Sequence, residues 1–239
     1  MQGASGSAFQ VDGVGEVWRI APMFSTRRRR PRPMTLILFV CGAVIAVGVL
    51  ALVWLYYPWM RRPWLPTTAA RERVEQVARE SGTFPLERPR VVVHKAARSL
   101  ELFDGERLMK VYPIALGTNP VDAKRKEGDG CTPEGSFVVC TRNERSRYHL
   151  FLGLSYPNAE DAERGLRVGQ ITRAQHDEIV AAVRAGKRPP WNTPLGGEVG
   201  IHGGGTESDW TVGCIALENG DIEELFLLLS LGDDVMIEP

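Results

Sequence analysis

Residues 201–217 read IHGGGTESDWTVGCIAL and differ from every other part of this sequence. His202 leaves an apolar run and enters three glycines, and Cys214 follows twelve positions later, between Gly213 and a second apolar run. A free thiol is mostly protonated at neutral pH, so a nucleophilic cysteine needs a base such as histidine within hydrogen-bond reach. A glycine beside the nucleophile lets backbone N–H groups approach an oxyanion closely. The pattern predicts that His202 and Cys214 form a site for acyl transfer.

Structural roles are also open for both side chains. A cysteine in an oxidising compartment often forms a disulfide, and a histidine at a strand end often packs or caps. His202 and Cys214 are both metal-ligand types, but the sequence contains neither a CxxC nor an HxxxH pair to complete a site. We therefore expect no metal ion, and the choice between catalysis and a structural role stays open on these residues alone.

From residue 90 to the C-terminus, short apolar runs alternate with turn residues, which is typical of a β-rich domain. Asp104 and Gly105 form the turn of a hairpin, and Thr172 with Gln175 forms a capping box that opens a helix. A segment of this length buries enough surface to fold alone. We expect a mainly β domain with helical insertions. The expected strands cover 90–94, 99–103, 108–116, 135–141, 148–154, 198–201 and 235–237, and the expected helices cover 158–167, 172–186 and 221–230.

Before this domain, residues 34–57 read MTLILFVCGAVIAVGVLALVWLYY, 24 positions without a charged residue, proline or amide. At about 1.5 Å per residue, a helix of this length spans a hydrocarbon core of roughly 30 Å with some tilt. A buried core helix and a cleavable signal peptide are the alternatives. A signal peptide, however, has a shorter apolar region that ends at small residues, whereas aromatic residues follow here. We expect one N-terminal transmembrane helix.

The charges around this span predict its orientation. Residues 1–88 carry 12 basic and 6 acidic side chains and the later residues 17 and 23, although the whole chain has 29 of each. Five arginines lie within residues 27–32, and such an excess holds a terminus in the cytoplasm. Bound nucleic acid is the alternative, and the zero net charge argues against it. We expect a disordered cytoplasmic tail over 1–33, a linker with a short helix over 58–89, and an exported domain over 90–239.

Residues 201–203 and 213–215 resemble the active-site signature of the L,D-transpeptidase catalytic-domain family, in which His-Gly is followed by a lid and then by Gly-Cys and an apolar residue. Residues 128–137, GDGCTPEGSF, are similar to the Thr-Pro-Glu-Gly turn of that family. The resemblance covers residues 90–239, because the hairpin over 91–117, the helix over 219–226 and the last strand over 235–238 also agree with it.

Three features depart from the common pattern of the family. Val212 stands where a second histidine is usual, and only eleven residues separate His202 from Cys214, so the lid is short. Residues 209–211, Asp-Trp-Thr, and residues 155–158, Ser-Tyr-Pro-Asn, are similar to a variant branch. The histidine that serves as the base in the family is retained as His202. The departures leave the acceptor and the substrate range open.

The resemblance implies an L,D-transpeptidase-like β-sandwich or barrel, and a ping-pong reaction on peptidoglycan in a bacterial envelope without any cofactor. His202 takes the proton of Cys214, whose sulfur attacks the carbonyl of the third residue of a stem tetrapeptide. Backbone N–H groups around Thr211 to Cys214 hold the oxyanion, with Thr211, Gly213 and Gly203 as the oxyanion or supporting residues. Terminal D-alanine leaves, and the thioester passes to an amine of a second stem peptide or of an envelope protein tethered to the wall.

Two other functions stay open on this scaffold. In an L,D-carboxypeptidase, water rather than an amine resolves the thioester, and a non-catalytic module only binds the wall. Cys131 and Cys140 flank the Thr-Pro-Glu-Gly turn and are either paired or free.

Several further side chains are candidates for binding substrate. Asp209 is a candidate for orienting substrate amines, but formation of a turn before Trp210 is the favoured explanation. Core packing likewise explains the aromatic candidates for a substrate groove, which are Tyr148, Tyr156, Trp191 and Trp210.

Overall fold

The structure of the chain is a computed structural model that describes residues 45–49, 51, 64–82 and 84–239. These residues belong to two units, Met1–Arg62 and Pro63–Pro239. In the first unit, residues 45–49 and 51 are helical. Among the described residues, no helix has the length and hydropathy that crossing a bilayer requires. The predicted tail over 1–33 lies outside the described residues, as does most of the predicted span over 34–57.

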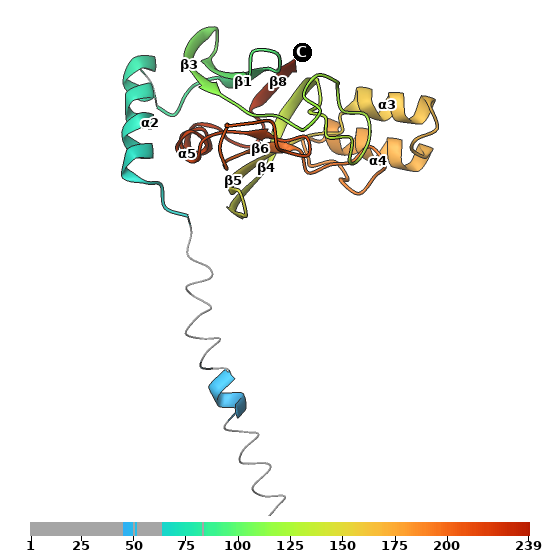
Figure 1. Cartoon of the computed structure of the whole chain (residues 1–239), viewed down its shortest axis with the longest axis horizontal. Helices are drawn as coiled ribbons and strands as arrows, with labels where there is room; N and C mark the ends of the chain where they lie inside the picture. Colours follow the sequence, from blue (N-terminus) through green and yellow to red (C-terminus); the bar gives the residue numbers. More distant parts are fainter. Residues whose placement is uncertain (1–44, 50, 52–63, 83) are drawn as a thin grey trace, which may run out of the picture. The chain divides into compact units, whose positions relative to one another are not determined.

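The second unit is built on an eight-stranded sheet with the strand order β3-β2-β1-β8-β4-β5-β6-β7 (Figure 1). The pairs β1–β8 and β6–β7 are parallel, and the other neighbours are antiparallel. The strands are β1 (Pro89–His94), β2 (Ser99–Asp104), β3 (Arg107–Pro113), β4 (Gly135–Ser146), β5 (His149–Leu154), β6 (Gly200–His202), β7 (Ile215–Ala216) and β8 (Asp234–Glu238).

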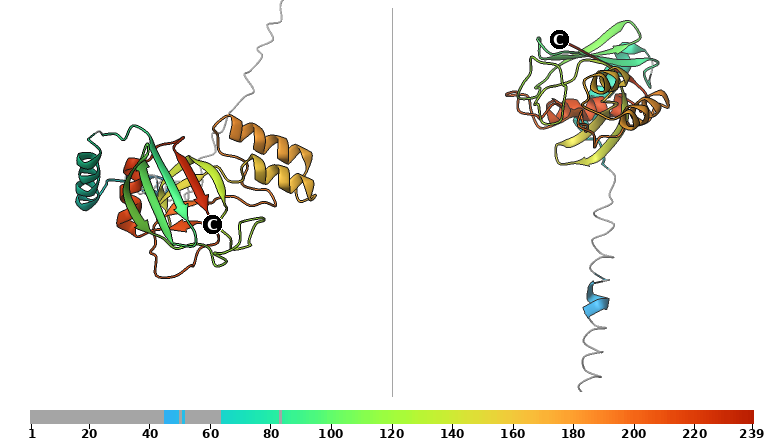
Figure 2. Two further views of the ribbon diagram at one scale, coloured as in Figure 1. Left: turned by 90° about the horizontal axis from the view of Figure 1, so that it is seen from above. Right: turned by 90° about the vertical axis from the view of Figure 1, so that its right-hand side faces the viewer.

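The sheet curls, and its two edges meet. Strand β4 joins the two halves, because residues 135–138 pair with β8 and later residues of β4 pair with β5. Beyond β3, the backbone of Ala115 exchanges hydrogen bonds of 2.9 and 2.8 Å with Ala216 on the opposite edge strand β7. The mainly β, barrel-like architecture with helices is therefore confirmed (Figure 2).

The inner face of the sheet packs against helix α5 (Asn219–Leu228) in one apolar core. Ile222, Leu225 and Phe226 of α5 are at most 1% exposed. Each buried side chain of this size contributes about 1.5–3 kcal/mol relative to leaving it in water. This core fixes the position of α5 directly after the site segment 201–217.

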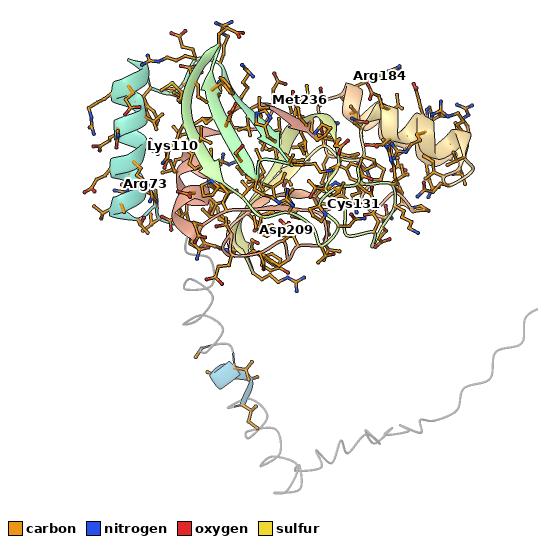
Figure 3. The ribbon with its side chains drawn as sticks, turned by 45° about the horizontal axis from the view of Figure 1, so that its top comes forward. Arg73, Lys110, Cys131, Arg184, Asp209 and Met236 are labelled. Atoms are coloured by element: carbon orange, nitrogen blue, oxygen red, sulfur yellow. The ribbon has the colours of Figure 1, made fainter. Side chains whose placement is uncertain are left out.

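Helix α2 (Thr68–Ser81) packs on α5 and belongs to the same unit. The Thr67 hydroxyl accepts a hydrogen bond from the Ala70 N–H at the N-terminus, and Gly82 ends the helix with φ 83°. Arg73 of α2 and Lys110 of β3 both pair with the fully buried Glu224 of α5 (Figure 3). The region that the sequence assigns to a linker thus contributes a docked helix.

Helices α3 (Ala159–Arg167) and α4 (Arg173–Arg184) are inserted between β5 and β6, and lie at the end of the domain opposite α2 (Figures 1 and 2). The predicted capping box of Thr172 and Gln175 is confirmed. The two helices enclose a small apolar cluster of their own, which includes Ile171 and Ile179.

The predicted strands and helices are confirmed within a few residues, with two differences. The strand expected over 198–201 is β6 at 200–202, because Glu198 has a φ of 54° that does not fit a strand. The sequence analysis missed β7, which has only two residues and no alternation of its own.

Candidate active site

The two residues of the predicted catalytic pair lie on neighbouring strands. His202 is the last residue of β6, and Cys214 directly precedes β7, which pairs with β6 in parallel. The register places Ile201 opposite Ile215, so Cys214 lies beside the start of β6. Both side chains line one cavity of about 310 Å³. The structure thus brings together the histidine and the cysteine of the motif.

Two glycines of the motif allow close approaches that a side chain would prevent. Gly213 has a φ of 132°, and a Cβ there would lie 2.5 Å from the Cys131 carbonyl oxygen. A Cβ on Gly203 would lie 2.5 Å from the Asn219 side-chain oxygen. The Gly203 N–H donates to the Tyr148 carbonyl over 3.0 Å. Both positions therefore require glycine, because any larger residue would clash with these neighbouring oxygen atoms.

Thr211 holds the turn that leads into Cys214. Its hydroxyl donates to the Cys214 carbonyl over 2.7 Å and accepts from the Gly213 N–H over 3.1 Å. The Thr211 N–H donates to the Leu116 carbonyl. The N–H groups of Thr211 and Gly213 are thus engaged within the fold of the turn. In the described part of the chain, the N–H groups of Val212 and Cys214 have no acceptor, so within the predicted oxyanion segment 211–214 these two donors are free.

The imidazole of His202 is fixed in one orientation. Nδ1 lies 2.6 Å from the Gly203 carbonyl oxygen, and a carbonyl only accepts hydrogen bonds, so Nδ1 carries the ring proton. The ring stacks on Tyr148 with centroids 4.7 Å apart, and the edge of Trp210 packs against it at 5.5 Å. Nε2 is consequently the nitrogen that can accept a proton.

The surroundings of Cys214 and His202 favour the neutral forms of the thiol and the imidazole. Burial raises the pKa of Cys214 to about 11, although the Gly200 N–H and the charge of Lys124 oppose it. Burial lowers the pKa of His202 below 6.5, although the hydrogen bond to the Gly203 carbonyl raises it in part. The sulfur of Cys214 donates to the Glu198 carbonyl over 3.4 Å.

The structure separates the predicted substrate-groove residues into two groups. Tyr148 and Trp191 line the cavity of Cys214 and His202, whereas Trp210 lines a neighbouring cavity of about 480 Å³ with Gly204 and Gly205. Tyr156 is fully buried, and its hydroxyl donates to the Leu195 carbonyl. Tyr156 is therefore a core residue.

Asp209 faces the protein rather than a substrate. Its carboxylate accepts from Arg98 over 2.8 and 3.1 Å and from the Leu116 N–H over 2.8 Å. Burial raises the pKa of Asp209, but the hydrogen bonds from Arg98 and Leu116 outweigh this effect and hold the pKa below 3.8. These contacts anchor the segment before Thr211, and a role for Asp209 in orienting substrate amines stays a prediction.

Replacing Asp209 by asparagine should lower activity through this anchor. We expect Asp209→Asn to reduce the free energy of unfolding by about 1–2 kcal/mol, because hydrogen bonds to a charged group are lost. We also expect the rate of acyl transfer to fall about tenfold through looser placement of the Cys214 turn. Urea denaturation and turnover assays measure the two effects. Wild-type values for both would show that the anchor is dispensable.

A second cavity, of about 430 Å³, also reaches Cys214. It shares Trp191, Glu198 and Cys214 with the first cavity and adds Lys124 and Val212. The sequence analysis missed Glu198 and Lys124 as site residues, because the first lies in a glycine-rich turn and the second in a polar loop without any motif for it. Cys214 therefore lines two adjoining cavities.

Among the described residues, the other cysteines and the acidic groups form no additional metal or disulfide centre. Cys131, Cys140 and Cys214 are all free thiols, so the disulfide left open for the first two is not formed. Within residues 45–49, 51, 64–82 and 84–239, no three His, Cys, Asp or Glu side chains converge as metal ligands.

The fold and the site define the class of protein. Residues 88–237 match the profile of the L,D-transpeptidase catalytic domain (YkuD). The chain therefore belongs to the L,D-transpeptidase catalytic-domain family, as the motifs indicate. A comparison with curated proteins found no match.

Solved structures with a similar fold come from several bacteria. Bd1075 of Bdellovibrio bacteriovorus is 20% identical over 65% of this chain and 49% of its own, with a TM-score of 0.43. The helical cell shape determining protein Pgp2 of Campylobacter jejuni is 22% identical over 69% and 55%, with a TM-score of 0.42. An L,D-transpeptidase of Xylanimonas cellulosilytica is 16% identical over 68% of each chain, with a TM-score of 0.37. The chain spans about half the length of the first two.

Proposed function

We propose that this protein is a membrane-anchored peptidoglycan L,D-transpeptidase that acts through a thioester on Cys214. Its substrates are stem tetrapeptides, and its products are cross-links between two third residues or envelope proteins tethered to the wall. The observation that carries the proposal is that Cys214 lines two adjoining cavities, with His202 lining one of them. This arrangement leaves room beside Cys214 for both the bound acyl group and an acceptor amine.

In the first half-reaction, the thiol of Cys214 leaves the Glu198 carbonyl and gives its proton to Nε2 of His202 as the sulfur attacks. The bond between sulfur and the carbonyl carbon of the third stem residue forms, and the carbonyl electrons move to oxygen. The N–H groups of Val212 and Cys214 bind this oxyanion. When the intermediate collapses, the amide bond breaks and His202 protonates the departing amine of D-alanine.

In the second half-reaction, an amine takes the place that D-alanine left. His202 removes a proton from this amine while its nitrogen attacks the thioester, and the sulfur of Cys214 leaves as the new amide forms. The same imidazole thus serves as base and acid in both halves, which agrees with a single orientation of its ring.

Anchoring at the cytoplasmic membrane is part of this proposal. The apolar stretch over 34–57 and the arginines before it support a single-pass helix with the N-terminus inside and the catalytic domain in the periplasm. A reporter fused after residue 66 tests this topology, because a periplasmic reporter should be active and a cytoplasmic one inactive.

The products formed from tetrapeptide muropeptides test the reaction itself. We expect the full-length protein to release D-alanine and to form dimers without free tripeptide. Tripeptide as the only product would indicate a carboxypeptidase instead. Release of neither product by folded protein would indicate a module that only binds the wall.

The acid side of the pH profile should reflect the lowered pKa of His202. The base form of the imidazole persists as pH falls until the pH reaches that pKa, so we expect kcat/KM to decline only below pH 6.5. No ionisation of Cys214 should appear near neutral pH, since its pKa is about 11. Rates of D-alanine release between pH 4.5 and 9 measure this. An acid limb centred at or above pH 7 would indicate a preformed thiolate–imidazolium pair.

A further inference from the structure

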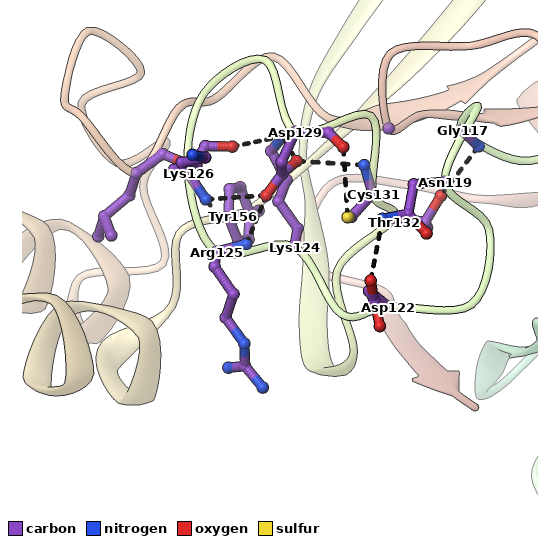
Figure 4. Close-up of polar contacts among 12 residues, drawn as sticks. Gly117, Asn119, Asp122, Lys124, Arg125, Lys126, Asp129, Cys131, Thr132 and Tyr156 are labelled. Atoms are coloured by element: carbon purple, nitrogen blue, oxygen red, sulfur yellow. Dashed lines mark hydrogen bonds and ion pairs between the residues drawn. The ribbon is translucent and has the colours of Figure 1, made fainter.

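Lys124 is a buried lysine in the polar loop between β3 and β4. Its side chain is only 4% exposed. Nζ donates to the Asp129 carboxylate over 2.9 Å and to the Lys126 carbonyl over 3.1 Å (Figure 4). An ammonium group has three N–H donors, so one has no acceptor among the described residues. Lysine is almost never fully buried without a reason, and this one lines the second cavity of Cys214.

Asp129 fixes this lysine without cancelling all of its charge at the cavity. The carboxylate also accepts hydrogen bonds from the N–H groups of Arg125, Lys126 and Cys131, over 2.7, 2.9 and 3.1 Å. Burial raises the pKa of Asp129, but these bonds together with that of Lys124 outweigh it and lower the pKa below 3.8. Because backbone dipoles already hold the negative charge, the ammonium remains available to a second anion.

The same loop lies directly against the turn that carries the nucleophile. The point where a Cβ of Gly213 would stand lies 3.6 Å from Nζ of Lys124. Adding one C–C bond of about 1.5 Å places the ammonium within about 5 Å of the Gly213 Cα. The cavity on this side is lined by Lys124, Val212, Gly213 and Cys214, so the lysine and the residues that carry the two free N–H groups border the same space.

We propose that Lys124 is the cationic member of the oxyanion site and stabilises the tetrahedral intermediate formed on Cys214. This inference rests on the proposed function. The proton of the thiol still goes to His202, the S–C bond forms, and the carbonyl electrons move to oxygen, while Lys124 keeps its proton and transfers none. The negative charge on oxygen exists only in the intermediate and disappears when the intermediate collapses. The ammonium group therefore stabilises the intermediate more than it stabilises the substrate.

The effects of Glu198 and Lys124 on the pKa of Cys214 support an electrostatic role for this lysine. Glu198 raises the pKa of the thiol, whereas Lys124 lowers it, and burial exceeds both effects. A cation held in a water-poor wall acts more strongly on a nearby anion than an exposed one does. A purely structural alternative exists, in which Lys124 only fastens the loop to Asp129, and the experiment must separate the two roles.

The test compares Lys124→Met with Lys124→Arg and with Lys126→Met in the full-length protein. Lys126→Met is the matched control, because it removes the same charge from an exposed side chain of the same loop. One readout is the rate of D-alanine release. The other is alkylation of the peptide that carries Cys214 by iodoacetamide at pH 9, which reports the thiolate fraction and does not depend on the enzymatic reaction.

We expect Lys124→Met to lower the rate of D-alanine release about 10- to 100-fold. This loss is no larger than that caused by removing one oxyanion donor, because Asp129 partly neutralises the charge of Lys124. Alkylation of Cys214 should fall about tenfold, with Lys124→Arg and Lys126→Met close to wild type. A structural role predicts the opposite for alkylation, because a loosened loop exposes the thiol and speeds the reaction. Faster or unchanged alkylation of Lys124→Met would overturn the inference. If the wild-type protein releases no D-alanine but Lys124→Met is still alkylated more slowly, the proposed function is wrong, whereas the effect of Lys124 on the thiol is supported.

Discussion

Replacing Cys214 by alanine is expected to abolish D-alanine release, with a loss of at least about 10⁴-fold, because the sulfur that forms the thioester is gone. The cavity walls do not depend on this side chain, so the free energy of unfolding should change by less than about 1 kcal/mol. Release of D-alanine from tetrapeptide muropeptides measures the first effect, and urea denaturation measures the second.

Cys140→Ala provides the matched control for this substitution. Burial raises the pKa of Cys140 to about 11 as well, so the two thiols are alike in acidity. Cys140 lies in β4 and lines neither cavity that reaches Cys214. The Cys140→Ala protein should therefore keep wild-type activity. Full activity of Cys214→Ala would exclude both the transpeptidase and the carboxypeptidase.

Replacing His202 by glutamine is expected to lower D-alanine release by about 10²–10⁴-fold, the usual contribution of a general acid–base group. Glutamine can still donate a hydrogen bond to the Gly203 carbonyl, so the substitution removes the base more than the local structure. His176→Gln is the control, because that imidazole lies on α4 and pairs only with Asp177.

The pH profile of His202→Gln separates loss of a base from loss of structure. Without the imidazole, the sulfur must lose its proton to solvent, so the remaining rate should rise with pH toward the thiol pKa of about 11. The decline below pH 6.5 should disappear. A variant that keeps the wild-type profile at a uniformly lower rate would show that another group is the base.

The sequence predicts the reacting atoms better than their surroundings. Cys214 and His202 are recognisable because their neighbours are glycines and apolar residues, and the strands β6 and β7 place them on one cavity. Thr211 and Gly213 are near the oxyanion in sequence, but their N–H groups are used within the turn. The sequence indicates the segment 211–214, and the hydrogen-bond pattern of the described residues shows that its Val212 and Cys214 N–H groups are the ones without an acceptor.

The roles of Asp209 and Lys124 could not be predicted from the sequence, because they depend on long-range contacts. Asp209 is anchored by Arg98, which lies 111 positions earlier in the chain. Lys124 acquires its importance because its loop folds back against Gly213. Neither partner lies near the motif in sequence, so no periodicity or local pattern indicates the contact. The predicted transmembrane span is a different case, because it lies largely outside the described residues and remains a prediction.

The central claim is that an acyl group is carried by the sulfur of Cys214 with His202 as its base. The most direct measurement is the intact mass of the full-length protein after treatment with a carbapenem, followed by mapping of the modified peptide. The account predicts one covalent adduct, located on Cys214, absent from Cys214→Ala and formed more slowly by His202→Gln. An adduct of equal yield in Cys214→Ala, or D-alanine release by a wild-type protein that never carries an acyl group on this sulfur, would contradict it.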